Sequence, residues 1–484
     1  MLQKKLNSHI IYKKENRGMK MKNLKVQDIL KVINGKLICG DINLMCENFS
    51  KDTRNIKKGD IYIGIKGESF DGSKFWKQAL EKGANAVIIS NIEIDGKEIE
   101  EFKNKTIIQV KDTLEALYEI AKLKISLYNI PVIAITGSVG KTSTKDIVSN
   151  VVSKKYKTLK TIGNNNNNIG LPFTILRLKE EEAIVLEMGM NHLGEISLLS
   201  NIAKPDICII TNIGTSHIGN LGSRENILKA KLEILDGAKE QIVIINNDND
   251  LLHKWYEEKK GKYKIYTYGI NNESDFTAKD IILSIKNSEF KYIDEGKEIR
   301  VKVPIGGEHF VLNALCAVAV GSVLKIGTKN IVSGIENFEL TKKRMDITNL
   351  ENGAKIINDS YNASFESMQA SLRYLSDFKD SRKIAVLGDM FELGNFSKEL
   401  HEKVGKEVYE NGIDILICSG ENSKYISIQA KKQGMAEENI YYFENKEEII
   451  GSLKSIIKSN DVILFKASNG MKFIDLVEKI KEIF

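Results

Sequence analysis

Residues Thr136–Ser143 read TGSVGKTS and follow the apolar run Val132–Ile135. This order predicts a buried strand, a turn that contains Gly137 and Gly140, and a helix that starts near Lys141. Glycines let backbone N–H groups converge on an anion, and the first turn of the helix adds the positive end of its dipole. The stretch therefore predicts a phosphate-binding loop between a strand and a helix.

The side chains of this loop fit a nucleoside triphosphate. Lys141 would meet the β- and γ-phosphate oxygens, and the Thr142 hydroxyl suits Mg²⁺. The loop is shorter than its common form, because only Ser138 and Val139 separate the two glycines. An ordinary strand-to-helix turn with an exposed lysine is the alternative. The expected ATP-binding residues of the loop are Gly137, Ser138, Val139, Gly140, Lys141, Thr142 and Ser143.

Three further apolar runs end in polar residues. Residues 183–186 lead into Glu187, residues 207–210 lead toward His217, and residues 242–245 lead into NNDND. Such runs, separated by helical patterns, predict a parallel α/β sheet, whose ligands bind at the carboxyl ends of the strands. We expect Glu187 to hold Mg²⁺ and His217 to lie at the same edge. A solvated loop carboxylate and a structural histidine are the alternatives.

Composition and charge restrict the class of protein. The 484 residues are 42% hydrophobic and 28% charged, which is ordinary for a globular protein of two to four domains. Six lysines and one arginine in residues 1–22 carry the excess of positive charge, so the remainder shows no nucleic-acid footprint. No apolar run approaches the ~18 residues of a membrane span. The five cysteines lack metal-binding spacing, which favours a reducing cytoplasm.

The pattern along the chain predicts three α/β domains after a basic leader. We expect residues 1–20 to be a disordered arm or an over-extended start, and residues 21–128 to form a small mixed α/β domain. Residues 129–340 would form the central P-loop-type domain with a parallel sheet and a β-rich excursion near 276–303. Residues 341–484 would form a Rossmann-like, doubly wound domain with strands at 383–387, 413–418 and 462–465.

An ordered series of motifs, taken together, resembles the muramyl (Mur) ligase family, the ATP-dependent amide-forming enzymes of peptidoglycan synthesis. The likeness covers nearly the whole chain from about Met21. The motifs are KDTR (51–54), KGESFDG (66–72), TGSVGKTS (136–143), GNNNNNIGLP (163–172), EMG (187–189), NIGTSHIGNLGS (212–223), KAKLEIL (229–235), GEHFVLNAL (307–315), NDSYNASFESM (358–368) and GDMFELG (388–394).

The resemblance implies a reaction and its partners. DMFELG and YNAS…SM favour the member that joins D-alanyl-D-alanine to UDP-N-acetylmuramoyl-tripeptide. ATP would phosphorylate the peptide carboxylate, and the dipeptide amine would displace phosphate from the acyl phosphate. Two Mg²⁺ ions and preorganised cations would stabilise the negative charge in both steps. The resemblance also implies a cytoplasmic enzyme, and we expect a monomer.

The resemblance assigns roles to individual residues. Lys141, His217, Lys231 and Arg344 would be catalytic, and the metal ligands would be Thr142, Glu187, His217 and a carbamylated Lys231. Carbamylation requires a neutral amine and hence partial burial. The expected nucleotide contacts outside the loop are Asn246, Asp248, His309, Asn313 and Arg344. The expected substrate contacts are Thr53, Arg54, Lys66, Glu68, Asn166, Asn167, Tyr361, Asn362, Asp389 and Glu392.

Several positions depart from the family pattern. Ser73 stands where a histidine is usual, Ser364-Phe365 where an asparagine-proline pair is usual, and Asn168 where an acidic residue is usual. KASNGM (466–471) replaces the usual lysine-glycine-serine-arginine. These departures concern the acceptor pocket more than the ATP site. The alternatives are a sister ligase that adds an amino acid to a muramyl dipeptide or a folate, and a P-loop NTPase that switches a partner.

Overall fold

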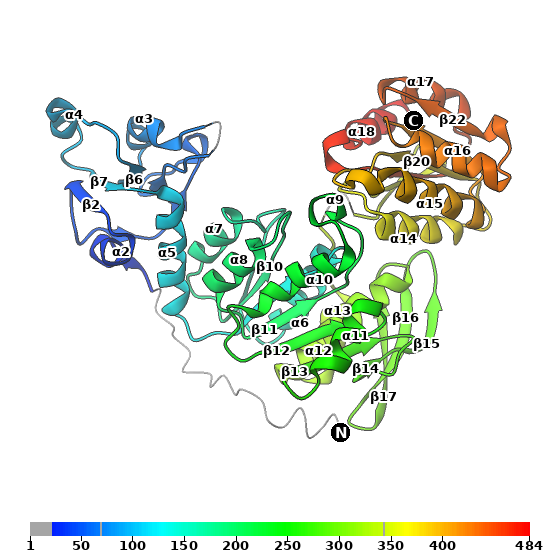
Figure 1. Ribbon diagram of the computed structural model, residues 1–484, viewed down its shortest axis with the longest axis horizontal. Coiled ribbons are helices and arrows are strands. Elements are labelled where there is room, and N and C mark those ends of the chain that lie inside the picture. Colours follow the sequence, from blue (N-terminus) through cyan, green and yellow to red (C-terminus); the bar gives the residue numbers. More distant parts are fainter. Residues whose placement is uncertain (1–21, 68–69, 342–343) are drawn as a thin grey trace.

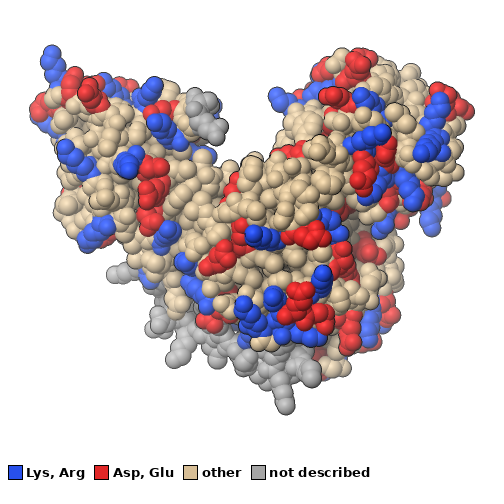
Figure 2. Space-filling model, viewed as in Figure 1, with Lys and Arg blue, Asp and Glu red and all other residues tan. Residues whose placement is uncertain are grey.

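The computed structural model describes residues 22–67, 70–341 and 344–484, which form three lobes (Figure 1). The N-terminal lobe (blue to cyan) and the C-terminal lobe (yellow to red) stand on either side of the central lobe (green). The space-filling view shows a deep notch between the two outer lobes (Figure 2). The predicted leader, residues 1–20, lies outside the described residues, and so does Glu68.

The N-terminal lobe contains a five-stranded sheet in the order β2-β7-β6-β5-β4, in which β2 is antiparallel to its neighbour. Two further strands, β1 and β3, have two residues each and form an antiparallel pair beside it. The chain then runs through α5 toward the central lobe (Figure 1). The elements are β1 (Leu24–Lys25), α2 (Val26–Ile33), β2 (Lys36–Cys39), β3 (Met45–Cys46), β4 (Phe49–Ser50), β5 (Ile61–Ile63), α3 (Trp76–Glu81), β6 (Ala86–Ser90), α4 (Gly96–Glu101), β7 (Thr106–Val110) and α5 (Thr113–Ser126).

The central lobe contains a seven-stranded parallel sheet in the order β14-β13-β12-β11-β8-β10-β9. Its main elements are β8 (Val132–Thr136), α6 (Lys141–Ser153), β9 (Thr158–Lys160), α7 (Gly170–Leu176), β10 (Ala183–Glu187), α8 (Glu195–Ala203), β11 (Ile207–Ile210), α9 (Ile218–Leu221), α10 (Arg224–Leu232), β12 (Ile242–Asn246), α11 (Asp250–Lys259), β13 (Lys264–Gly269), β14 (Phe276–Thr277), α12 (Glu308–Val323) and α13 (Thr328–Glu336). The predicted parallel sheet is confirmed.

The β-rich excursion is also confirmed, as a separate antiparallel sheet of three strands. Its members are β15 (Lys279–Leu283), β16 (Ser288–Asp294) and β17 (Lys297–Val303). It lies on the side of the central lobe that faces the C-terminal lobe (Figure 1).

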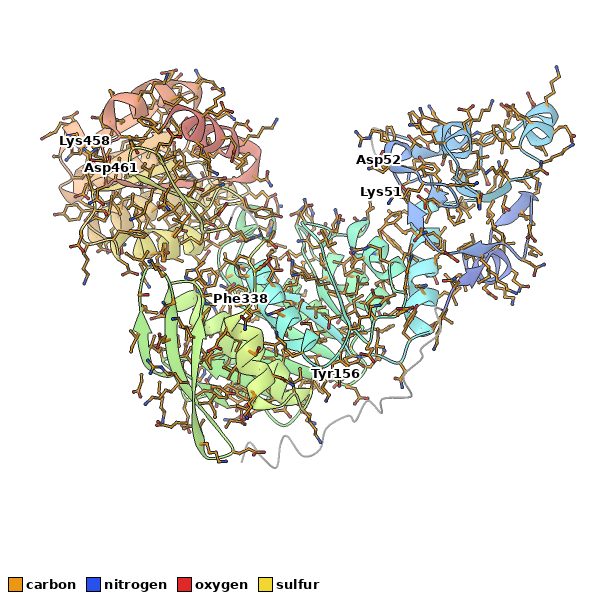
Figure 3. All side chains as sticks on the ribbon, turned by 180° about the vertical axis from the view of Figure 1, so that it is seen from behind. Lys51, Asp52, Tyr156, Phe338, Lys458 and Asp461 are labelled. Atoms are coloured by element: carbon orange, nitrogen blue, oxygen red, sulfur yellow. The ribbon has the colours of Figure 1, made fainter. Side chains whose placement is uncertain are left out.

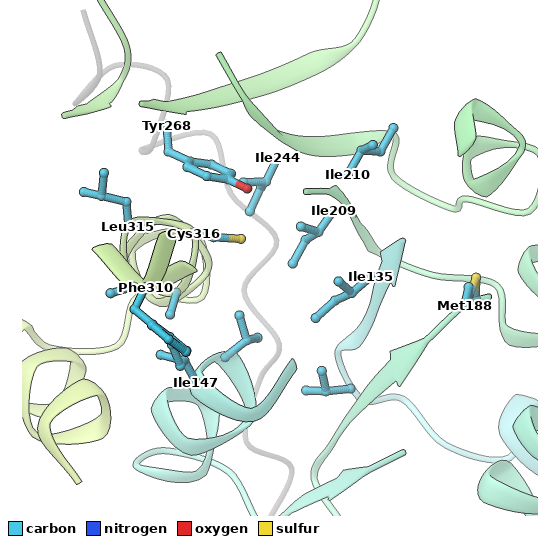
Figure 4. Packing of buried hydrophobic residues seen from close by; sticks show 14 of the residues in the cluster. Ile135, Ile147, Met188, Ile209, Ile210, Ile244, Tyr268, Phe310, Leu315 and Cys316 are labelled. Carbon is cyan, nitrogen blue, oxygen red and sulfur yellow. The ribbon is translucent and has the colours of Figure 1, made fainter. Parts of the chain in front are cut away.

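Packing against helices explains why the central strands read as continuous apolar runs. Ile135, Ile209 and Ile244 come from three neighbouring strands and are fully buried. Phe310 of α12 and Ile147 of α6 cover this face of the sheet (Figure 4). Strands of a parallel sheet that are buried on both faces need no polar alternation. The strand register then brings the residues that follow β8, β10, β11 and β12 to one edge.

The C-terminal lobe has a six-stranded sheet in the order β18-β19-β23-β20-β21-β22, parallel except for β18. Its elements are β18 (Asp346–Asn349), β19 (Lys355–Asn358), α14 (Phe365–Ser376), β20 (Lys383–Gly388), α15 (Ser397–Glu410), β21 (Ile415–Ser419), α16 (Lys424–Gln433), β22 (Ile440–Phe443), α17 (Glu447–Ile456), β23 (Val462–Lys466) and α18 (Ile474–Ile483). The three-domain α/β fold is confirmed. The exact domain boundaries, at 128 and 340, stay our prediction.

None of the helices in the described part of the chain is both long and apolar enough to cross a membrane.

Candidate functional site

The phosphate loop lies between β8 and α6, and its backbone requires glycine. Gly137 and Gly140 have φ values of 146° and 81°, in the left-handed region that side chains disfavour. A Cβ on Gly137 would also lie 1.9 Å from the Thr211 hydroxyl oxygen. The loop therefore turns sharply against β11, and α6 begins at Lys141 with its N-terminus at the turn.

The segment after β11 supports this loop from the side. Val139 N–H donates to the Asn212 side-chain oxygen at 2.9 Å, and the Thr211 hydroxyl donates to the Val139 carbonyl at 2.6 Å. Gly214 N–H donates to Ser138 Oγ at 2.9 Å. The loop is thus held in shape before any nucleotide binds.

Lys141 folds back over the loop. Its amine donates to the carbonyls of Gly137, at 2.7 Å, and Ser138, at 3.2 Å. Burial lowers the pKa of Lys141, while Glu187 acts in the opposite direction. Phosphate oxygens would offer the amine stronger partners than these carbonyls, because they are negatively charged.

A hydroxyl and a carboxylate meet beside the loop. Thr142 Oγ1 donates to Glu187 Oε2 at 2.9 Å, and Asn166 Nδ2 donates to Glu187 Oε1 at 2.8 Å. Oxygen ligands of this kind suit Mg²⁺. Among the described residues no three His, Cys, Asp or Glu side chains gather as a metal site. Water and phosphate oxygens would therefore have to complete the coordination shell.

His217 sits at the start of α9, with a φ of 65°. Its Nδ1 forms an ion pair with Glu392 of the C-terminal lobe. The hydrogen bond to His217 lowers the pKa of Glu392. An expected metal ligand and an expected substrate contact thus face each other across the two lobes.

Lys231 lies on α10 and is fully buried, and its amine has no hydrogen-bond partner. Burial lowers the pKa of Lys231 well below its ordinary value, and the charge of Lys141 adds to the effect. Carbamylation requires the unprotonated amine, which burial favours, so a buried amine without a hydrogen-bond partner fits this modification.

Arg344 reaches the phosphate loop from the start of the C-terminal lobe. Its Nη2 donates to Thr142 Oγ1 at 2.9 Å, and its guanidinium carbon lies 4.1 Å from the centre of the Tyr361 ring. Cation–π stacking of this kind fixes the plane of a guanidinium. Arg344 can therefore present a positive charge to a bound triphosphate.

The phosphate loop, Glu187, His217 and Arg344 border one cavity of about 420 Å³ between the central and C-terminal lobes, whereas Lys231 does not line it. Lys141, Glu187 and His217 share its wall, although they follow three different strands. The predicted residues that line it are Ser138, Val139, Gly140, Lys141, Thr142, Ser143, Asn166, Asn167, Glu187, His217, Asn246, His309, Asn313, Arg344, Tyr361 and Asn362.

Three expected ligand carboxylates, Asp248, Asp389 and Glu392, do not border this cavity, although Glu392 contacts His217 in its wall. Asp248 accepts hydrogen bonds from the N–H groups of residues 270–272, at 2.6 to 3.0 Å. Asp389 accepts from Asn422 N–H at 3.0 Å and Ser423 N–H at 2.7 Å. The side chains of Asp248 and Asp389 stabilise loops, which is the alternative use of a carboxylate that follows a strand.

The expected nucleotide-sugar contacts lie in the N-terminal lobe, away from the cavity. Thr53 donates to Gln78 Oε1 at 2.7 Å, and Arg54 pairs with Asp52 at 2.7 Å. Lys66 lies in the same lobe and is exposed. Asp52 and Lys51 stand at the margin that faces the other lobes (Figure 3). This group could hold only a distant part of a long substrate.

Sequence reasoning missed an ion pair in the wall of the cavity. Lys466, at the end of β23, pairs with Asp359, which follows β19, and Lys466 is only 2% exposed. His309 lies nearby, and burial lowers its pKa to about 4. Part of the signal was available, since Lys466 directly follows an apolar run that was predicted as a strand, whereas the short strand before Asp359 was not predicted.

The departures from the family pattern have local explanations. The Ser73 hydroxyl is buried, donates to the Gly64 carbonyl at 3.0 Å and accepts from Ser90 N–H at 2.9 Å. Asn168 donates to the Tyr118 hydroxyl of α5 at 3.1 Å. Ser364 caps the N-terminus of α14. Each residue is therefore satisfied within the fold.

Three family models match the chain in order. They are the Mur ligase family catalytic domain at residues 48–125, the Mur ligase middle domain at 135–321, and the Mur ligase glutamate ligase domain at 343–469. A curated relative, UDP-N-acetylmuramoyl-tripeptide–D-alanyl-D-alanine ligase of Bacillus subtilis, is 36% identical over 461 residues, covering 94% of this chain and 98% of the relative. The chain belongs to the Mur ligase family. The resemblance drawn from the motifs is confirmed.

This Mur ligase also superposes on solved structures of the family. MurF from Acinetobacter baumannii is 29% identical with a TM-score of 0.85, and the match covers 96% of this chain and 99% of that one. MurF ligase from Thermotoga maritima, solved in complex with ADP, is 28% identical with a TM-score of 0.78, covering 90% and 97%.

Proposed function

We propose that this chain uses ATP to join D-alanyl-D-alanine to UDP-N-acetylmuramoyl-tripeptide, releasing ADP and phosphate, in the synthesis of peptidoglycan precursors. One observation carries the proposal: a single cavity brings the phosphate loop, Glu187 and residues of the C-terminal lobe together. The identity of the substrates is inferred from relatives that this chain matches over almost their whole length.

The reaction would proceed through an acyl phosphate. A peptide carboxylate oxygen attacks the γ-phosphorus of ATP and ADP leaves. The dipeptide amine then attacks the acyl carbon and phosphate leaves. Lys141 and Arg344 would stabilise the negative charge that builds up in both steps, and their contacts with the phosphate loop support this role.

Two Mg²⁺ ions would neutralise charge on the triphosphate and on the acyl phosphate. Thr142 and Glu187 would hold one ion, since their oxygens already converge. His217 would serve the second after leaving Glu392. A carbamate on Lys231 would add an anion near these residues. The buried amine without a hydrogen-bond partner is the observation behind this assignment.

Binding of the two substrates would involve different lobes. Thr53, Arg54 and Lys66 would contact the UDP end, while Asn166 and Asn167, which line the cavity, would contact the substrate nearer its reacting carboxylate. Tyr361 and Asn362 would shape the acceptor pocket, with Glu392 at its margin. We place Asp389 behind this pocket as a loop anchor. Water excluded by closure of the lobes could not hydrolyse the acyl phosphate.

We further propose a monomer that acts in the cytoplasm, where nucleotide-linked precursors are made. Cell shape and division would depend on its product, because the peptide it completes belongs to the cell wall.

A coupled assay of ADP release tests the function. Purified protein receives ATP, Mg²⁺ and UDP-N-acetylmuramoyl-tripeptide, together with D-alanyl-D-alanine, a free diamino acid or glutamate. We expect ADP release with the dipeptide alone. Release with a single amino acid and a different carboxylate substrate, a muramyl dipeptide or a folate, would indicate a sister ligase. Hydrolysis without any carboxylate substrate would indicate an NTPase switch, and either result would overturn the proposal.

A further inference from the structure

The C-terminal lobe contacts the segment that supports the phosphate loop. Glu366, in the first turn of α14, accepts hydrogen bonds from Thr215 N–H at 2.7 Å and Thr215 Oγ1 at 3.1 Å. The two residues belong to different lobes and are separated by 151 positions. Hydrogen bonds to a carboxylate are stronger than those between neutral groups. This contact forms only when the lobes are docked.

The contacted segment continues directly to the phosphate loop. Gly214, next to Thr215, donates its N–H to Ser138 Oγ at 2.9 Å. Two residues earlier, Asn212 accepts from Val139 N–H at 2.9 Å. A shift of Thr215 therefore moves the groups that hold Ser138 and Val139. The C-terminal lobe and the phosphate loop are thus joined by a short, continuous series of hydrogen bonds.

Gly214 shows how closely Glu366 approaches. A Cβ on Gly214 would lie 2.5 to 2.8 Å from the three carboxyl atoms of Glu366. Gly214 does not have a positive φ, so its backbone would accept alanine without strain. The nearest obstacle to a side chain here is the carboxylate of the other lobe. The positive end of the α14 dipole stabilises that carboxylate, although the phosphate site is close.

We propose that Glu366 is a positioning residue that couples docking of the C-terminal lobe to the shape of the phosphate loop. Nucleotide then binds more tightly when the lobes are docked, and by reciprocity bound nucleotide stabilises docking. The inference rests on the ATP site of the proposed function. It does not depend on which acceptor the enzyme uses.

Titration of the full chain with Mg-ADP, followed by calorimetry, tests the coupling. We expect Glu366→Ala to raise the Kd for Mg-ADP about 10-fold, because one or two hydrogen bonds to a charged group are lost. Glu366→Gln keeps acceptor geometry and should stay within about 3-fold of the wild type. Thermal midpoints of all variants check that they fold.

Tyr374→Phe is the matched control. Tyr374 also joins the lobes, since its hydroxyl donates to the Ile285 carbonyl at 2.6 Å, but Ile285 lies in the turn between β15 and β16 and not in the phosphate-loop support. We expect a smaller change in Kd than for Glu366→Ala. If Glu366→Ala binds Mg-ADP no more weakly than Tyr374→Phe, the coupling is wrong.

A double-mutant cycle with Gly214→Ala tests whether Glu366 affects Mg-ADP binding through the segment that contains Gly214. The substitution should weaken Mg-ADP binding in the wild type and in Tyr374→Phe, but add little in Glu366→Ala, because the displaced carboxylate is already absent. Full additivity with Glu366→Ala would overturn the inference. The titration needs no peptide, so a wild type that binds Mg-ADP but does not ligate defeats only the proposed substrates. A wild type that does not bind Mg-ADP defeats both.

Discussion

The carboxylate of Asp146 accepts hydrogen bonds from both the backbone N–H of Thr341, at 3.0 Å, and its hydroxyl, at 2.8 Å. Asp146 lies on α6, which starts at the phosphate loop, and Thr341 precedes Arg344 at the entrance to the C-terminal lobe. The contact fixes where the connection between the lobes begins. It anchors the chain three positions before Arg344, whose guanidinium donates to Thr142 Oγ1.

Changing Asp146 tests this connection. Burial opposes ionisation, but Lys145 and Lys160 outweigh it and lower the pKa of Asp146. Asp146→Ala would leave the buried Lys145 without its partner, so we expect a loss of about 3–5 kcal/mol in the free energy of unfolding. Thr341→Val removes one hydrogen bond and should cost about 1 kcal/mol. Urea denaturation measures both. Equal losses in the two variants would contradict the role of the buried pair.

Removal of Lys141 or Glu187 tests the phosphate site. We expect Lys141→Ala and Glu187→Ala each to lower tripeptide-dependent ADP formation by about 100-fold or more, because charge stabilisation is lost in both chemical steps. The coupled ADP assay measures the rate, and circular dichroism checks the fold. Glu180→Ala is the control, since Glu180 is exposed and only pairs with Lys157. Normal turnover in either site variant would remove that residue from the mechanism.

Lys231 should need its amine for more than packing. We expect Lys231→Ala to lose roughly 10- to 100-fold in activity and to recover part of it with short carboxylates, which replace the carbamate anion. Lys229→Ala, an exposed lysine on the same helix, should remain active. Depletion of CO₂ should slow the wild type and leave Lys231→Ala unchanged. Full activity of Lys231→Ala would show that no carbamate is required.

The pH dependence of stability should reveal His309. Burial lowers its pKa to about 4 from 6.5, so between these pH values the unfolded chain binds a proton that the folded chain does not. The free energy of unfolding should therefore fall as the pH drops from 6.5 to 4, and this contribution should level off below 4. His309→Gln should show a shallower fall. His401, whose pKa burial also lowers, is present in both proteins and cancels. Parallel curves would refute the prediction.

The central sheet and the phosphate loop could be predicted because their signals are local. An apolar run such as Val132–Ile135 predicts a buried strand directly, and the structure has a buried strand at these residues. The positive φ of Gly137 and Gly140 follows from residue type. Strands β18, β19 and β22 were missed because each has four residues, and part of each is exposed or flanked by polar residues.

Side-chain roles were harder to predict, because a carboxylate after a strand has several uses. Glu187 and Asp248 look alike in the sequence, yet Glu187 faces the cavity while Asp248 is occupied by the N–H groups of a neighbouring loop. Glu366 lies within the motif NDSYNASFESM, but nothing in the sequence assigned it a role. Its partner, Thr215, lies in another lobe, so the contact depends on how the lobes dock.

The notch between the outer lobes has a consequence for which donors the enzyme accepts (Figure 2). The N-terminal lobe stands apart from the cavity, so a donor held at both places must stretch across open space. Such an enzyme would select its donor by length. A fragment without the nucleotide would lose the contacts with the N-terminal lobe. A donor with a shortened peptide would not reach the reacting phosphate.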